Sequence, residues 1–374
     1  MPCPRLWLSY VGSLGLLLAA LTAPAAAIPM YAQQYGVTCA KCHDVIPQLN
    51  EFGAAFLASG YRIPGVKPGP AFPLASKINY VVSSENQGEG EDGAGLPKTI
   101  VDEVEVFVAG GIGSRASYLA EQYLVDGGEP GLTRDLWLMD RLNPWDAKVP
   151  VYLQGGQFTL PLLIDPETFR TTYQGYTVYE QTVGGNPFNF FEPKIGGRLG
   201  IGNLLRGTSV QLFAGPGHDA QSGLPTSGTD WMAYGQQAAG PWTGAVYRYA
   251  GTRPVDGASD RFERMGYGLV YNNWGRWLGE SLLQTGWDSA CGAGTIAGCA
   301  SSGGFVQMRY SMNKRLFALG RYEGTNAPNG GFSRDGVLLL GFGPTEWSRI
   351  TVEDVISTSP HTANTLNVQF TLAF

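Results

Sequence analysis

The feature that most constrains this chain is an alternation of apolar and polar residues that recurs from Lys77 to the C-terminus. Between Leu366 and Phe374 every second residue is large and apolar, and the residues between them are polar or small. Such a period of two indicates a strand with one apolar and one polar face. Breaks in the pattern give sixteen predicted strands: 75–84, 99–111, 116–125, 132–141, 148–159, 193–203, 207–216, 229–238, 241–251, 261–272, 277–288, 303–312, 315–323, 333–342, 346–357 and 364–374.

The connections between these strands alternate in length. Short connections are predicted at 113–115, 203–206, 239–242, 273–277, 313–314 and 343–346, and long ones at 86–98, 160–192, 217–228, 252–260, 289–303 and 324–332. A soluble β-sandwich also alternates, but short turns at one end and long loops at the other are typical of outer-membrane barrels. We therefore predict an all-β fold, a transmembrane antiparallel β-barrel of about 16 strands over residues 77–374. A short α-helical segment precedes it.

The longest connection, residues 160–192, is rich in aromatic side chains. Residues 171–181 also fit a strand, but a seventeenth strand would break the alternation of short and long connections. Aromatic rings gain nothing from exposure to water, and loops of this length usually have a function or fold inward. We predict an external loop that packs inside the barrel lumen.

The first 27 residues indicate a cleaved secretory signal peptide. Arg5 precedes an apolar run, 11–21, and three alanines end at Ala27, so cleavage is expected before Ile28. The alternative is a membrane-anchoring helix, but the run is shorter than the roughly 20 residues that a span needs. The net charge of −6 argues against nucleic acid as a partner, because binding to phosphates needs a basic surface.

The mature N-terminus carries the strongest chemical motif, Cys39-Ala40-Lys41-Cys42-His43. This spacing is the one used for covalent attachment of a c-type haem, with the adjacent histidine as proximal iron ligand. A redox dithiol would need a βαβ context, a zinc site would need two more ligands, and a disulfide would leave His43 unexplained. We predict one covalent haem c on Cys39 and Cys42, with its iron bound by His43.

Residues 28–65 are predicted to form a small helical cytochrome segment around this motif. Pro47 is expected to open a helix, Phe52 and Phe56 fall at helical spacing, and Gly60 is placed to end it. Residues 66–76, rich in proline and glycine, form a semi-rigid linker to the barrel.

The second axial ligand of the iron is not specified by the pattern. Met30 is a weak candidate because it is close in sequence, while His218 and His361 fall in predicted loops, and a five-coordinate iron is an alternative. With Cys3 lost in the leader, Cys291 and Cys299 are the cysteines left over, and they are predicted to form a loop disulfide.

Four carboxylates, Glu85, Glu89, Glu91 and Asp92, crowd the first external loop. Such a group could bind Fe²⁺ or Ca²⁺, which prefer oxygen ligands, but a solvated polar loop is the more common meaning of this pattern.

The sequence "YAQQYGVTCAKCHDVIPQLNEFGAAFLASGYRIP" resembles the fused monohaem cytochrome–porins, the group that includes outer-membrane iron oxidases. The terminal Phe374 likewise resembles the assembly signal of Gram-negative outer-membrane proteins. The resemblance implies a location in the outer membrane, in contact with its lipid, with the haem segment on the periplasmic side or inside the lumen. It also implies electron transfer from an extracellular donor, with Fe(II) favoured, to a periplasmic cytochrome or other soluble carrier. Whether this amounts to Fe(II) oxidase activity is left open.

Two other functions fit the same sequence. One is a solute-diffusion porin whose haem-bearing segment is a periplasmic plug or sensor. The other is a soluble periplasmic cytochrome attached to a β-sandwich.

Overall fold

The computed structural model describes residues 30–63, 65–69, 74–89, 95–144, 147–186, 188–203, 207–218, 225–255, 258–290, 298–328, 331–358 and 362–374. The predicted leader, 1–27, lies outside these residues. Among the residues described, no helix has the length and apolar character to cross a membrane.

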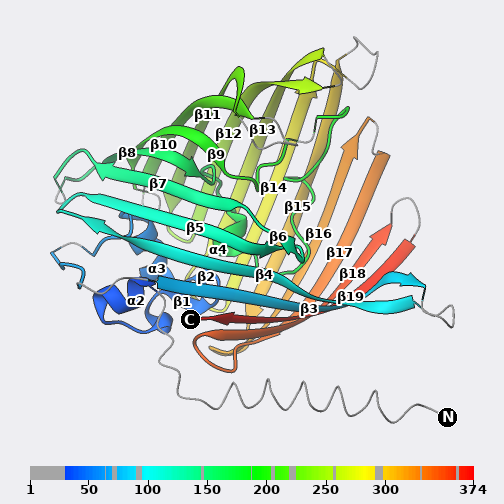
Figure 1. Cartoon of the computed structure of the whole chain (residues 1–374), viewed down its shortest axis with the longest axis horizontal. Coiled ribbons are helices and arrows are strands. Elements are labelled where there is room, and N and C mark those ends of the chain that lie inside the picture. The colour runs from blue at the N-terminus through cyan, green and yellow to red at the C-terminus, as the bar shows by residue number, and fades with distance from the viewer. Residues whose placement is uncertain are drawn as a thin grey trace.

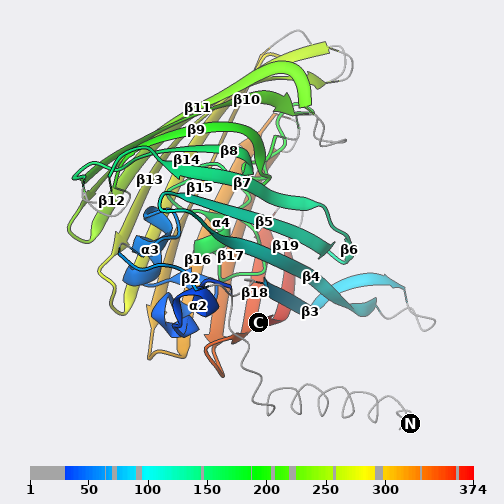
Figure 2. The same ribbon diagram turned by 60° about the vertical axis from the view of Figure 1, so that its left-hand side comes forward.

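A closed antiparallel barrel forms most of the described chain (Figures 1 and 2). Its strands are β3 (Leu74–Glu89), β4 (Gly95–Ile112), β5 (Ala116–Asp126), β6 (Glu129–Pro130), β7 (Thr133–Arg141), β8 (Val151–Phe158), β9 (Lys194–Gly202), β10 (Gly207–His218), β11 (Pro225–Ala239), β12 (Trp242–Val255), β13 (Ala258–Asn272), β14 (Trp277–Asp288), β15 (Cys299–Ser311), β16 (Leu316–Ala327), β17 (Gly331–Phe342), β18 (Ser348–Thr358) and β19 (Thr362–Ala373). β19 pairs with β3 and closes the wall. Apart from the two-residue β6, which pairs only with the end of β5, the described residues contain sixteen wall strands. The predicted fold class is confirmed.

The two faces of the wall differ in polarity. Leu283, Val306 and Leu338 are more than half exposed on the outside, whereas Glu280 and Gln307 are buried on the inside. An apolar exterior suits lipid, and a closed wall leaves no strand edge whose polar backbone would meet it.

The long external connections differ from the prediction. The predicted loops 86–98, 217–228, 252–260 and 324–332 are largely continuations of the strands beside them. For example, β3 continues to Glu89 and β4 begins at Gly95. The hydrophobic alternation stops where contact with lipid stops, but the backbone still needs hydrogen-bond partners, so the strands stay paired beyond that level.

The segment before the barrel contains α2 (Met30–Tyr35), the 3₁₀ helix η1 (Cys39–Lys41), β1 (His43–Val45), β2 (Gln48–Leu49) and α3 (Glu51–Ala58). Figures 1 and 2 place it at one end of the barrel, and its contacts are with the short turns and with inward-facing side chains there. The prediction that Pro47 opens the helix is wrong. Residues 43–49 pair as a small hairpin, and Asn50 instead caps α3 by accepting a hydrogen bond from Gly53 N.

The connection 160–192, which contains α4 (Pro166–Phe169), folds into the lumen as predicted. Its residues Tyr176, Tyr179 and Phe190 are buried, and Tyr176 stacks on Phe305 of β15. α4 appears between the near and far walls in both views (Figures 1 and 2).

Candidate functional site

The two cysteines of the motif lie on one tight turn. The backbone N–H of Cys42 donates to the carbonyl of Cys39 at 3.0 Å, and both thiols are free. Burial raises the pKa of Cys39 to about 11, with the charge of Glu346 adding to the effect, and burial also raises the pKa of Cys42. Both side chains are therefore neutral thiols at neutral pH, the state from which thioether bonds to haem are made.

His43 is oriented by the backbone of the hairpin that follows it. Its Nδ1 lies 2.9 Å from the carbonyl oxygen of Pro47. A carbonyl can only accept, so Nδ1 carries the proton, and Nε2 keeps the lone pair that a metal ligand needs. Burial lowers the pKa of His43, against the opposing effect of backbone hydrogen bonds to Pro47 and Gln48, and this favours the neutral ring.

Asn50 and Gly53 hold the motif against α3. The Asn50 backbone N–H donates to the Cys42 carbonyl at 2.9 Å, and its side-chain Nδ2 donates to the Ala40 carbonyl at 3.2 Å. A Cβ on Gly53 would stand 2.0 Å from the carbonyl oxygen of Cys42, so only glycine allows this approach. Asn50 and Gly53, the two ends of the sequence Asn50-Glu51-Phe52-Gly53, therefore fix the turn that carries Cys39 and Cys42. We refer to this pair as the clamp.

An aromatic cluster gives the segment a small core. Tyr31 stacks on Tyr61 with 4.9 Å between ring centroids, and Phe56 meets Tyr31 edge-on at 5.0 Å. Tyr61 in turn stacks on Trp137 of β7 at 5.6 Å. The helical spacing of Phe56 predicted part of this core, but the contribution of the barrel through Trp137 has no local signal in the sequence.

Hydrogen bonds to backbone carbonyls attach the segment to the barrel. Arg62 Nη2 donates to the carbonyls of Gly113 at 3.0 Å and Ala116 at 2.5 Å, in the turn between β4 and β5. Ser117 Oγ donates to the Gly60 carbonyl at 2.5 Å, and Arg349 Nη1 donates to the Ile46 carbonyl at 2.8 Å.

Two cavities lie beside the segment within the barrel. The first, of about 270 Å³, is lined by the segment, the wall and residues 159–169. The second, of about 170 Å³, is lined by Ile46, Pro47, inward-facing charges of β3 to β5, and the loop. Neither is lined by Cys39, Cys42 or His43.

The donor set fits a c-type haem in its chemistry: two free thiols on one turn and a neutral histidine with an available Nε2. The distal candidates stay predictions, because His361 and the side chains of Met30 and His218 lie outside the described structure. Cys299 is disulfide-bonded, while its predicted partner Cys291 lies outside the described residues.

The acidic first loop is described only in part. Glu85 lies 3.9 Å from Lys98 in an exposed ion pair, whereas Glu91 and Asp92, like the side chain of Glu89, lie outside the description. In the described part of the chain, no three His, Cys, Asp or Glu side chains are grouped so that they could hold a metal ion.

Comparisons with known proteins identify the fold. No family model matches the chain, and no curated protein is similar to it. Among solved structures it is similar to an anion-selective porin from Comamonas acidovorans, with a TM-score of 0.61, 11% identity, and coverage of 81% of this chain and 99% of that one. It is also similar to OmpF of Salmonella typhi in a complex with daunomycin (TM-score 0.58, 12% identity, 81% and 97% covered). The outer-membrane channel DcaP of Acinetobacter baumannii is a further match (TM-score 0.51, 11% identity, 83% and 100% covered). At these identities the likeness is one of fold, which is that of a porin.

Proposed function

We propose that this chain is an outer-membrane barrel whose short-turn end carries a monohaem c-type cytochrome, and that it passes electrons from an extracellular donor to a periplasmic acceptor. Fe(II) is the donor we favour, on the resemblance of residues 31–61 to cytochrome–porins. The acceptor is a soluble periplasmic cytochrome or another small carrier. In this arrangement the short turns face the periplasm and the long strand extensions face outward.

One observation carries the haem assignment: Cys39, Cys42 and His43 are presented together, with both thiols free and Nδ1 of the histidine engaged by the Pro47 carbonyl. Haem c, when bound, supplies a one-electron redox centre that these side chains lack. The chain's own part is to fix the attachment turn through Asn50 and Gly53 and to orient His43.

The contents of the barrel are the support for choosing electron transfer in this proposal. The cytochrome segment occupies the short-turn end, and the loop 160–192 reaches across the lumen to Arg321 of β16 and Glu353 of β18. Both elements occupy part of the lumen. An electron needs no open path, only a redox centre within reach of donor and acceptor.

The second candidate is a solute-diffusion porin whose haem-bearing segment is a plug or sensor. Structural neighbours favour it, because one is named as an anion-selective porin and another as an outer-membrane channel. The two cavities in the lumen also leave room for small solutes.

The test uses full-length protein, produced with a haem-attachment system and reconstituted in liposomes and planar bilayers. Electron transfer predicts rapid reduction of the haem by Fe(II), followed by transfer to a cytochrome on the other side of the membrane, with low ion conductance. A His43→Ala variant should lose this transfer while its barrel stays folded. Slow or absent reduction by Fe(II), together with porin-level conductance, would overturn the proposal in favour of the diffusion porin.

A further inference from the structure

The first cavity of the lumen, of about 270 Å³, is lined by apolar and polar side chains that come from different elements. Leu57 of α3 and Leu160 and Leu162 of the connection 160–192 contribute apolar surface. Four neighbouring strands of the wall, β8 to β11, contribute polar side chains: Gln154, Arg198, Gln211 and Gln236. An apolar lining with a few convergent polar groups is the usual form of a small-molecule site.

The charge of Arg198 has no acidic partner among the residues that the structure describes. Its Nη2 donates to the neutral side-chain oxygen of Gln154, the residue opposite it on β8, and its Nε has no hydrogen-bond partner. The rings of Phe158 and Tyr152 lie with their centroids 5.3 and 5.8 Å from the guanidinium carbon and hold the group in place. The cavity therefore presents a positioned cation to whatever enters it.

Gln211 is a second polar group in this lining that lacks a partner. Its side chain is only 2% exposed, and its Oε1 has no hydrogen-bond partner in the described part of the chain. Buried side-chain polar atoms are nearly always hydrogen-bonded, and a glutamine amide can both donate and accept. Gln211 lies two residues from Phe213, which is paired with Arg198. Such diagonal neighbours are about 7–8 Å apart, so one small group between them can contact both.

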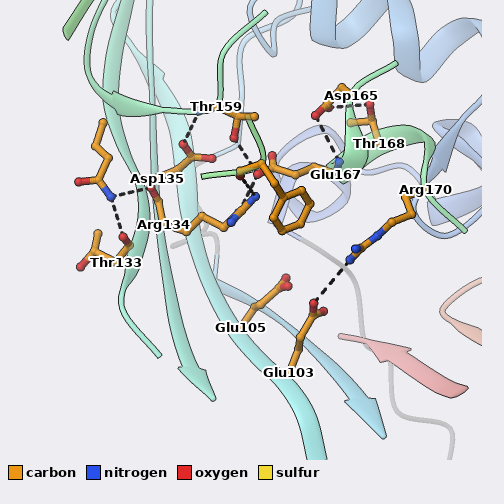
Figure 3. Close-up of polar contacts among 12 residues, drawn as sticks. Glu103, Glu105, Thr133, Arg134, Asp135, Thr159, Asp165, Glu167, Thr168 and Arg170 are labelled. Carbon is orange, nitrogen blue, oxygen red and sulfur yellow. Dashed lines mark hydrogen bonds and ion pairs between the residues drawn. The ribbon is translucent and has the colours of Figure 1, made fainter. Parts of the chain in front are cut away.

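The acids that line the same cavity already accept hydrogen bonds (Figure 3). Glu167 accepts from Arg134 Nε and from Thr159 Oγ1, each at 2.7 Å. Asp165 accepts from the backbone N–H of Glu167, and Asp135 accepts from that of Thr159, both at 3.2 Å. These acids belong to β7 and to the connection 160–192, whereas Arg198 belongs to β9. The anionic end of a ligand is therefore expected at β9.

We propose that this cavity binds a single-ring aromatic carboxylate, with its carboxylate between Arg198 and Gln211 and its ring against Leu57, Leu160 and Leu162. A guanidinium carries a planar fork of N–H donors that matches the two oxygens of a carboxylate. The volume of about 270 Å³ lies just below the roughly 300–1,000 Å³ of sites for drug-sized ligands, which suits a ligand of one ring. The site does not involve the cysteine–histidine motif and does not rest on the proposed electron transfer.

The test is isothermal titration calorimetry of the full-length protein in detergent with benzoate, and with benzamide as the neutral analogue. We expect one benzoate to bind per chain, and benzamide to bind about tenfold more weakly, because hydrogen bonds to charged groups are stronger than neutral ones. Arg198→Gln should weaken benzoate binding about tenfold or more and remove the preference over benzamide, and Gln211→Leu should weaken it severalfold.

Arg115→Gln is the matched control, because Arg115 lines the same cavity but is exposed and lies 3.8 Å from Asp140. It should bind benzoate as the unaltered protein does. Heat-modified electrophoretic mobility checks that each variant is a folded barrel.

Three results would overturn the proposal. The first is the absence of saturable benzoate binding to the folded protein. The second is benzamide binding as tight as that of benzoate, because the cavity would then recognise the ring without the charge. The third is benzoate binding that is unchanged in Arg198→Gln or, should that variant not fold, unchanged in Gln211→Leu.

Discussion

The N-terminal segment (residues 30–63) and the inward loop (residues 160–192) both occupy the barrel interior, but they are held by different means. Buried side chains of the wall hold the inward loop: Glu353 accepts from Tyr173 N and Gln174 N at 2.8 and 2.9 Å, and Arg321 donates to the Gly175 carbonyl at 2.7 Å. The N-terminal segment instead has its own aromatic core and clamp, and its attachments run in both directions: Arg62 donates to the Gly113 carbonyl, while Ser117 and Arg349 of the wall donate to carbonyls of the segment. The loop is therefore part of the barrel's interior packing, whereas the segment is a docked unit.

The largest expected effect is on covalent haem attachment, and it should leave the folding of the barrel unchanged. In a Cys39→Ser/Cys42→Ser double variant we expect complete loss of covalent haem, because no thioether bond can form. The barrel should still fold, since its wall makes no use of these thiols. Haem staining on a denaturing gel and heat-modified mobility measure the two properties.

A matched control for this variant is Cys299→Ser, which removes a disulfide-bonded cysteine at the start of β15. It should keep a full haem content. Haem that survives denaturation in the double variant would show that attachment lies elsewhere.

The next effect concerns the inward loop. Glu353 is fully buried, and a Glu353→Ala change leaves the N–H groups of Tyr173 and Gln174 without their acceptor. Each buried unsatisfied donor costs about 1–3 kcal/mol, so we expect a clear fall in thermal stability. Ion conductance in planar bilayers should rise as the loop loosens.

Asp354→Asn provides the control, because the neighbouring side chain lies on the other face of β18 and is partly exposed. It should change neither stability nor conductance. An unaltered conductance in Glu353→Ala despite a lower melting temperature would mean that the loop does not limit the aqueous path.

The barrel could be predicted from the sequence because its cause is local. Lipid outside and a polar lumen inside impose a period of two on each strand, and the last strand, ending at Phe374, shows it plainly. The strand extensions beyond the lipid carry no such signal, because paired backbone in water needs no apolar face.

Other parts of the interior have no local signal. Tyr173 and Glu353, which are hydrogen-bonded, are 180 residues apart in sequence. Arg62 donates to the backbone carbonyl of Gly113, and a backbone carbonyl is present at every residue, so the sequence does not mark it as a partner. By contrast, the Cys39–His43 motif and its Asn50 clamp are close in sequence, and for that reason the sequence singles out the motif.

A moderate effect is expected from removing the attachment that Arg62 gives the N-terminal segment. Arg62→Ala deletes the hydrogen bonds from a charged group to the turn between β4 and β5, interactions of about 1.5–3 kcal/mol each. We expect faster limited proteolysis within the segment and an unchanged melting temperature of the barrel. Arg115→Ala, an exposed arginine of the same turn, is the control. Equal resistance of both variants to protease would show that the segment is held by its aromatic contact with Trp137 instead.

The smallest effect tests whether a single contact of the docked unit matters at all. Ser117→Ala removes one hydrogen bond, from Ser117 Oγ to the Gly60 carbonyl, and a neutral bond of this kind contributes about 1 kcal/mol. Because the contact lies between the segment and the wall, the loss should appear as a severalfold increase in proteolysis of the segment, smaller than that of Arg62→Ala. Ser302→Ala, at an exposed position of β15, should leave the rate unchanged. If Ser117→Ala instead lowered the melting temperature of the barrel, segment and wall would unfold as one unit, and the distinction between a docked segment and an integral loop would fail.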